Sequence, residues 1–160
     1  MNFIPVKTLF LEQLNRVYCI KSHLIERFSE LNDHHGFSDI DQLIFRVCHR
    51  TEDQLVNFEI IYKLLQAVQS FAQCEDLIDY VENAFGQILK KQNDPLNRDF
   101  AILFYLHSLD GVEQGILALL DLFAAELKNP EVLSLLKKCK QETRADMALT
   151  ETLIQKHLNG

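Results

Sequence analysis

Several features that define whole classes of protein are scarce in this sequence of 160 residues. Basic residues are outnumbered, 16 against 23 acidic ones, and the net charge of −7 argues against nucleic-acid binding, which needs a basic face. The four cysteines are far apart and lack zinc-ligand or disulfide-framework spacing, so we interpret them as reduced thiols. No apolar run approaches the ~18 residues of a membrane span, and the N-terminus has no signal-peptide pattern. These absences predict a cytoplasmic protein that is not embedded in a membrane.

What is present predicts one all-α domain that spans residues 1–160. Hydrophobic residues make up 48% of the chain and charged residues 24%, which is the composition of an ordinary globular protein. A chain of this length buries on the order of two thirds of its unfolded surface, so the core needs no disulfides or metals for stability. Sustained alternation of apolar and polar residues, the signal of a half-buried strand, is absent.

Helix-start signals divide the chain into five predicted helices. Pro95 and Pro130 follow the capping residues Asp94 and Asn129, and proline is favoured in the first helical turn because its missing N–H needs no partner there. Pro5 marks a third start, and Ser38 marks a fourth in the segment GFSDIDQL. The predicted helices cover about residues 5–31, 39–72, 75–91, 95–127 and 130–158, with ends uncertain by about 2–4 residues.

The lengths of the connections predict how these helices pair. The connections at 32–38 and 128–129 are so short that each must join antiparallel neighbours. The link between the second and third long helices has about 20 residues, enough to run the length of a bundle. It carries an apolar stripe that would pack on the other helices: Leu77, Ile78, Val81, Phe85, Ile88 and Leu89. One long crossover of this kind is typical of ferritin-like four-helix bundles.

Polar residues interrupt the apolar seam of each long helix near its middle. They are Lys21 in the first helix, Asp110 and Glu113 in 95–127, and Glu142 and Asp146 in the last. The second helix is apolar on a broad face with two possible tracks, one interrupted by Thr51 and Gln54 and the other by His49 and Glu52. Four helices interrupted at similar depth predict one shared layer of ionisable side chains. Charges buried in such a layer must be paired, protonated or bound to metal.

Several segments, taken in order and spacing, resemble the YciE/YciF-like ferritin-like domain family, bacterial stress-associated four-helix bundles with an added crossover helix. The segments are LFLEQLNRVYCIKSHL, TEDQLVNFEIIYKLL, CEDLIDYVENAF and LLKKCKQETRADMALTETLI. The resemblance implies a ferritin-like fold. It also implies a di-metal site with Glu on the first helix, Glu-x-x-His on the second, an acid on the third and an acid with a second ligand on the fourth.

This sequence departs from that di-metal pattern in its first two helices. Lys21 stands where the resemblance places the first glutamate, and a charged ammonium group cannot bind a metal. His49 and Glu52 carry the second motif in swapped order. The last two helices keep acids at the corresponding places: Asp110, Glu113, Glu142 and Asp146.

Three hypotheses follow from this pattern. In the first, the protein is non-catalytic and binds no cofactor, Lys21 pairs with the four acids in place of a metal, and the chain associates as a homodimer through an apolar helix face. In the second, His49, Glu52 and the same acids bind iron or manganese in a metal-binding protein or oxidase. In the third, the bundle has no polar centre, the acids lie on the surface, and Lys21 reaches solvent along its own aliphatic stem.

Overall fold

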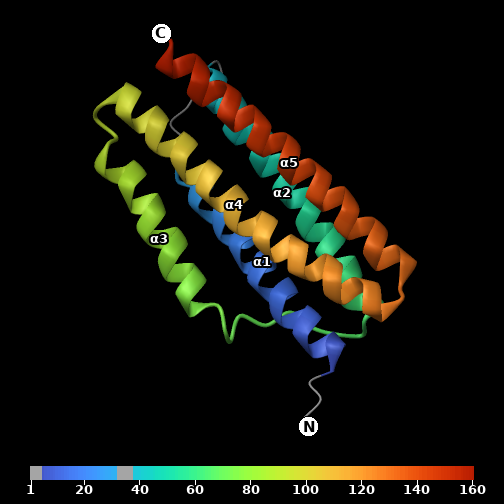
Figure 1. The fold of residues 1–160 in the computed structure, drawn as a ribbon. Helices are drawn as coiled ribbons and strands as arrows, with labels where there is room; N and C mark the ends of the chain where they lie inside the picture. Colours follow the sequence, from blue (N-terminus) through green and yellow to red (C-terminus); the bar gives the residue numbers. More distant parts are fainter. Residues whose placement is uncertain (1–4, 32–37) are drawn as a thin grey trace.

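The computed structural model describes residues 5–31 and 38–160, which contain five helices and no strand. The helices are α1 (Val6–Ser29), α2 (Asp39–Leu64), α3 (Glu75–Lys90), α4 (Pro95–Leu127) and α5 (Pro130–Leu158) (Figure 1). The four long helices form a ring in which α1 packs on α2 and α4, and α5 packs on α2 and α4. The predicted all-α class and both predicted helix pairs are therefore confirmed.

Side-chain caps start three of the helices at the predicted places. The side chains of Ser38, Asp94 and Asn129 each accept a hydrogen bond from a backbone N–H of the first turn, at 3.0, 3.3 and 3.1 Å respectively. Pro95 and Pro130 occupy the first helical turn of α4 and α5. The predicted connection at 32–38 lies, apart from Ser38, outside the described residues.

The second helix is shorter than predicted, because it ends at Leu64 and not near residue 72. Gln66 takes the left-handed conformation with φ of 53°. Its N–H donates to the carbonyl oxygen of Lys63 at 3.1 Å, and the N–H of Ala67 donates to that of Tyr62 at 2.9 Å. This pair of bonds is the Schellman ending of a helix. Glycine normally marks such an ending in a sequence, and here glutamine occupies the position.

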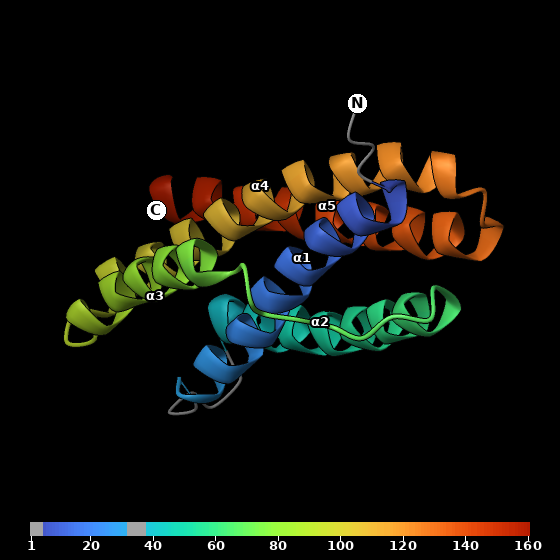
Figure 2. The ribbon, with the colours of Figure 1, turned by 90° about the horizontal axis from the view of Figure 1, so that it is seen from below.

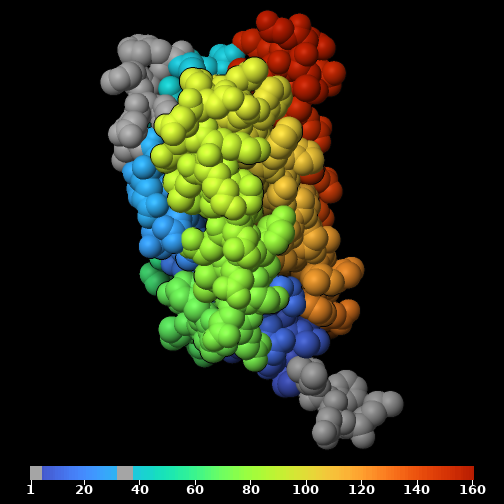
Figure 3. Space-filling model, turned by 90° about the vertical axis from the view of Figure 1, so that its left-hand side faces the viewer, coloured from blue at the N-terminus to red at the C-terminus, as the bar shows by residue number. Residues whose placement is uncertain are grey.

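The crossover carries α3 along α1 and α4, which confirms the predicted packing of its apolar stripe on the bundle except at Leu89, which is 46% exposed. Seen from below in Figure 2, α3 lies to one side of the long helices, and the segment that leads to it crosses α1. There the Asn15 side chain accepts hydrogen bonds from the Tyr62 hydroxyl at 2.6 Å and the Ser70 N–H at 3.1 Å. Figure 3 shows α3 lying over α1 and α4, which it packs against through Val81, Phe85 and other buried apolar residues.

No helix in the described part of the chain is both long and apolar enough to cross a membrane.

Candidate functional site

A buried ion pair joins α1 to α4 in the middle of the bundle. Lys21 is only 5% exposed and Glu113 only 1%. The Nζ atom of Lys21 lies 2.7 Å from Oε2 of Glu113, which is the distance of a close ion pair. Lys21 therefore points inward and does not reach solvent along its stem.

The surroundings of Lys21 keep its amine charged. Burial by itself would lower the pKa of Lys21, because an ammonium group loses its hydration. The carboxylate of Glu113 more than offsets this effect and raises the pKa above its ordinary value. Burial also raises the pKa of the Cys139 thiol, to about 12, so this neighbour is a neutral thiol at pH 7.

Asp110 lies one turn before Glu113 on α4 and faces a different balance of charges. The pKa of Asp110 is raised to about 8, mainly by burial and also by the nearby carboxylates of Glu113 and Asp146, and the Lys21 ammonium offsets only part of the rise. A carboxyl group with this pKa is largely protonated at pH 7. Asp110 therefore adds little negative charge to the layer.

Two arginines of α2 hold the acids of α5. Nη1 of Arg50 lies 3.3 Å from Oδ1 of Asp146 and also donates to the carbonyl oxygen of Glu142 at 3.1 Å. Nε of Arg50 lies 3.6 Å from the Glu142 carboxylate, and Nε of Arg46 donates to Oδ1 of Asp146 at 3.3 Å. Neither arginine was predicted from the sequence to lie in this layer. Their position in the sequence could have indicated this role. Arg46 and Arg50 lie one turn apart on α2, and each directly precedes a buried residue, Val47 or Thr51.

His49 and Glu52 do not join this layer. Their side chains are 69% and 60% exposed and lie 3.8 Å apart as an i,i+3 pair on the outer side of α2. The ring of His49 packs edge-on against Phe45, which is also exposed. α2 is apolar on a broad face, and the track that turns inward is the one containing Thr51 and Gln54. Placing His49 and Glu52 at the centre of the bundle was wrong for this reason.

The chain itself supplies the cations of this layer. Lys21, Arg46 and Arg50 face the carboxyl groups of Glu113, Glu142 and Asp146, and burial raises the pKa of Asp146 as it raises that of Asp110. These donors do not fit a di-metal centre, because ammonium and guanidinium groups already bind the carboxylates and the histidine lies outside. Within residues 5–31 and 38–160, no three His, Cys, Asp or Glu side chains form a group suited to a metal ion.

A four-helix bundle with a crossover helix and a central layer of acids defines the ferritin-like class of folds, and the predicted class is confirmed. The chain belongs to the family described as Domain of unknown function (DUF892), whose model matches residues 6–159. This membership and the structural matches below confirm the predicted YciF-like assignment.

Two solved structures have the same fold. The E. coli stress protein YciF superimposes with a TM-score of 0.86 and 16% sequence identity, over 98% of this chain and 99% of that one. YcfI from Rhodopseudomonas palustris gives a TM-score of 0.79 and 16% identity, over 94% of this chain and 96% of that one. Identities this low establish the fold alone. No curated protein matches the sequence significantly.

Proposed function

We propose that this protein is a non-catalytic, cytoplasmic member of its family, in which fixed cations of the chain replace the metal ions of a ferritin-like centre. It needs no cofactor and acts by association with other molecules, first as a homodimer. Like the E. coli protein described as a stress protein, it serves under stress conditions.

The contact between Lys21 and Glu113 is the observation that carries this proposal. A single ammonium group fills the space beside Glu113 at 2.7 Å, and the arginines of α2 neutralise the two acids of α5. A divalent cation entering this layer would meet repulsion from three positive groups and would have to displace them. The same carboxylates that suit a metal in other bundles therefore serve here as partners of the chain's own cations.

Metal analysis of the purified protein tests the proposal. Protein prepared without chelator in medium containing iron and manganese is expected to hold far less than one ion per chain, by elemental mass spectrometry at pH 7. Lys21→Glu removes the cation and adds a carboxylate beside Glu113, so this variant is expected to gain iron or manganese.

Lys137→Glu is the matched control, because it makes the same charge change at an exposed position of α5 and should gain no metal. Stoichiometric iron or manganese in the wild-type protein would contradict the proposal and favour the metal-binding alternative. That measurement stands even if the Lys21→Glu variant does not fold.

A further inference from the structure

Two cysteines that are far apart in the sequence meet where the crossover passes α1. Cys19 lies in the middle of α1, and Cys74 is the residue directly before α3. Their exposed fractions are only 4% and 1%, and both are free thiols. The fold therefore forms a thiol pair that the spacing of the cysteines in the sequence did not indicate.

The geometry of α1 places the two sulfur atoms next to each other. The Sγ atom of Cys74 lies 3.8 Å from the carbonyl oxygen of Asn15, one turn before Cys19. In an α-helix this carbonyl accepts the N–H of Cys19, and the side chain of Cys19 leans back over the same turn. The two thiols are in hydrogen-bond contact. A disulfide needs Cβ atoms about 4 Å apart, so rotation of the side chains can join such a pair with little movement of the backbone.

Contacts on both sides of Cys74 hold this part of the crossover on α1. Before Cys74, the backbone N–H of Ser70 donates to the side chain of Asn15 at 3.1 Å. After it, the guanidinium group of Arg16 donates to the carboxylate of Asp76 at 3.4 Å. The two thiols therefore stay together for as long as the crossover keeps its place.

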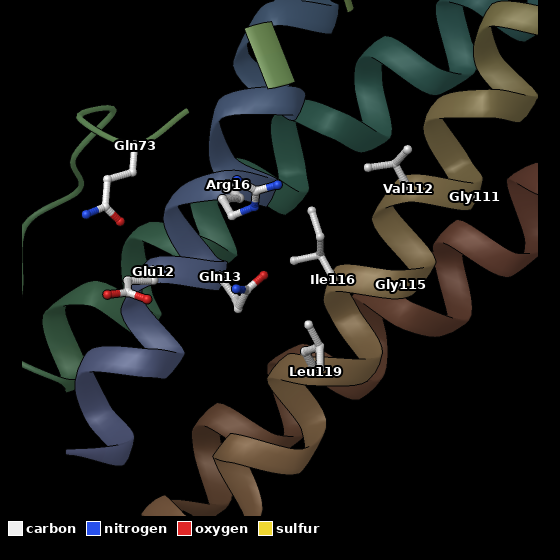
Figure 4. Close-up of a pocket in the computed structure, with 9 residues that line it drawn as sticks. All are labelled: Glu12, Gln13, Arg16, Gln73, Gly111, Val112, Gly115, Ile116 and Leu119. Carbon is white, nitrogen blue, oxygen red and sulfur yellow. The ribbon is translucent and has the colours of Figure 1, made fainter. Parts of the chain in front are cut away.

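A pocket of about 260 Å³ gives small solutes access to Cys74. Its lining comes from α1, with Asn15, and from the crossover, with Gln73 and Cys74. A second hollow, of about 580 Å³, also has Gln73 in its lining (Figure 4). Cys74 belongs to the lining of the smaller pocket and Cys19 does not, so a solute that enters it meets Cys74 first.

The surroundings of Cys19 make it the second thiol of the pair to react. The pKa of Cys19 is raised to about 12, mainly by burial and also by the neighbouring Cys74, and the charge of Arg16 offsets only part of the rise. Cys19 is therefore a neutral thiol at pH 7, and a neutral thiol is a poor nucleophile. Access and protonation both indicate that Cys74 reacts first.

We propose that Cys19 and Cys74 are a redox modification site, at which hydrogen peroxide forms a reversible disulfide that joins the crossover covalently to α1. The proposal is independent of the central charged layer and of self-association. Disulfides in reducing compartments are usually transient and redox-sensing, because glutathione returns them to thiols. A pair that is reduced at rest and closes only on exposure to peroxide is of this kind.

The reaction has two steps. The sulfur of Cys74 attacks one oxygen of the peroxide, so that an S–O bond forms, the O–O bond breaks, and the other oxygen leaves with the thiol proton as water. The sulfur of Cys19 then attacks that of Cys74, so that the S–S bond forms, the S–O bond breaks, and the departing hydroxide takes the proton of Cys19. Two thiols and one peroxide thus give one disulfide and two waters, with two electrons passing from sulfur to oxygen.

The disulfide should stabilise the folded chain. It closes a loop that contains the whole of α2, and a closed loop of this length restricts the unfolded chain far more than the folded one. We expect the Tm of the oxidised protein to be about 5–10 °C above that of the reduced protein.

Peroxide treatment of the folded protein tests the proposal. After treatment with hydrogen peroxide at pH 7, denaturation and maleimide labelling, the wild type is expected to have lost two of its four thiols. Tryptic digestion should yield the peptide Val17–Lys21 cross-linked to Leu64–Lys90, and dithiothreitol should separate the two. Thermal melts followed by circular dichroism should show the rise in Tm, and dithiothreitol should reverse it.

Three variants identify the thiols and their order of reaction. Cys48→Ala is the matched control, because it removes a thiol of α2 outside the pair and should form the disulfide like the wild type. Cys19→Ala should stop at the sulfenic acid of Cys74, which dimedone labels. Cys74→Ala should give neither a disulfide nor a dimedone adduct at Cys19.

Several results for the wild-type protein would overturn the proposal, and they stand even if a variant does not fold. They are four thiols that remain free after peroxide treatment, a disulfide that joins Cys74 to a second molecule, and a cross-link that forms only in urea. An intramolecular disulfide with an unchanged Tm would show that the bond does not stabilise the packing of the crossover on α1.

Discussion

Replacing Lys21 by methionine is expected to lower the free energy of unfolding by about 3–5 kcal/mol at pH 7, as measured by urea denaturation followed by far-ultraviolet circular dichroism. Methionine keeps most of the aliphatic volume of lysine but removes its charge. Glu113, which is 1% exposed, is then left without its 2.7 Å partner in the middle of the bundle. The loss should be smaller at pH 4, where the stranded carboxyl can take up a proton.

Two further variants show whether the loss comes from the ion pair. Lys137→Met changes an exposed lysine of α5 and should alter stability by less than about 0.5 kcal/mol. The double variant Lys21→Met/Glu113→Leu should recover most of the loss, because replacing a whole buried pair by apolar groups is often neutral. If Lys21→Met alone costs less than about 1 kcal/mol, the buried pair does not contribute as described.

The second large effect concerns Asp110 and the pH dependence of stability. Its pKa is about 8 in the folded chain, against an ordinary value of 3.8. The folded protein therefore binds this proton more tightly than the unfolded chain does. The resulting stabilisation is complete below pH 3.8 and is lost as the pH rises through 8. A shift of this size corresponds to at most about 6 kcal/mol, and the partial exposure of Asp110 reduces the expected effect to about 2–4 kcal/mol.

Asp110→Asn should remove this pH dependence. We expect the variant to match the wild type near pH 4 and to exceed its free energy of unfolding by about 2–4 kcal/mol at pH 8, with urea titrations across this range as the measurement. Asp53→Asn makes the same change at an exposed site of α2 and should follow the wild-type curve. Parallel curves for Asp110→Asn and the wild type would show that Asp110 is already ionised at neutral pH.

The parts of the fold that were predicted from the sequence are those set by local interactions. Ser38, Asp94 and Asn129 cap helices through bonds to residues two or three positions away, so a short segment contains the whole signal. The end of α2 depends equally on local bonds, but Gln66 adopts a conformation that sequences usually mark with glycine. The prediction therefore continued the helix beyond its true end.

The central layer was harder to predict, because its partners lie far apart in the chain. The inward positions of Lys21, Glu113 and Asp146 followed from the phase of narrow apolar seams. α2 is apolar over a broad face, and two phases fitted its sequence equally well, which placed His49 wrongly. Arg50 was missed because a long side chain reaches the layer from beside the seam, toward acids of α5 that sequence spacing does not connect with it.

The position of the Lys21–Glu113 pair also has a consequence for the order of folding. α1 and α4 are separated in the chain by α2, by the crossover and by α3, so the two charges meet only after the crossover has brought the chain back. Until then both groups keep their hydration, and the pair contributes nothing to the early steps. Contacts that form late leave the folding rate almost unchanged and slow unfolding instead. We therefore expect the pair to slow unfolding and to leave the folding rate almost unchanged.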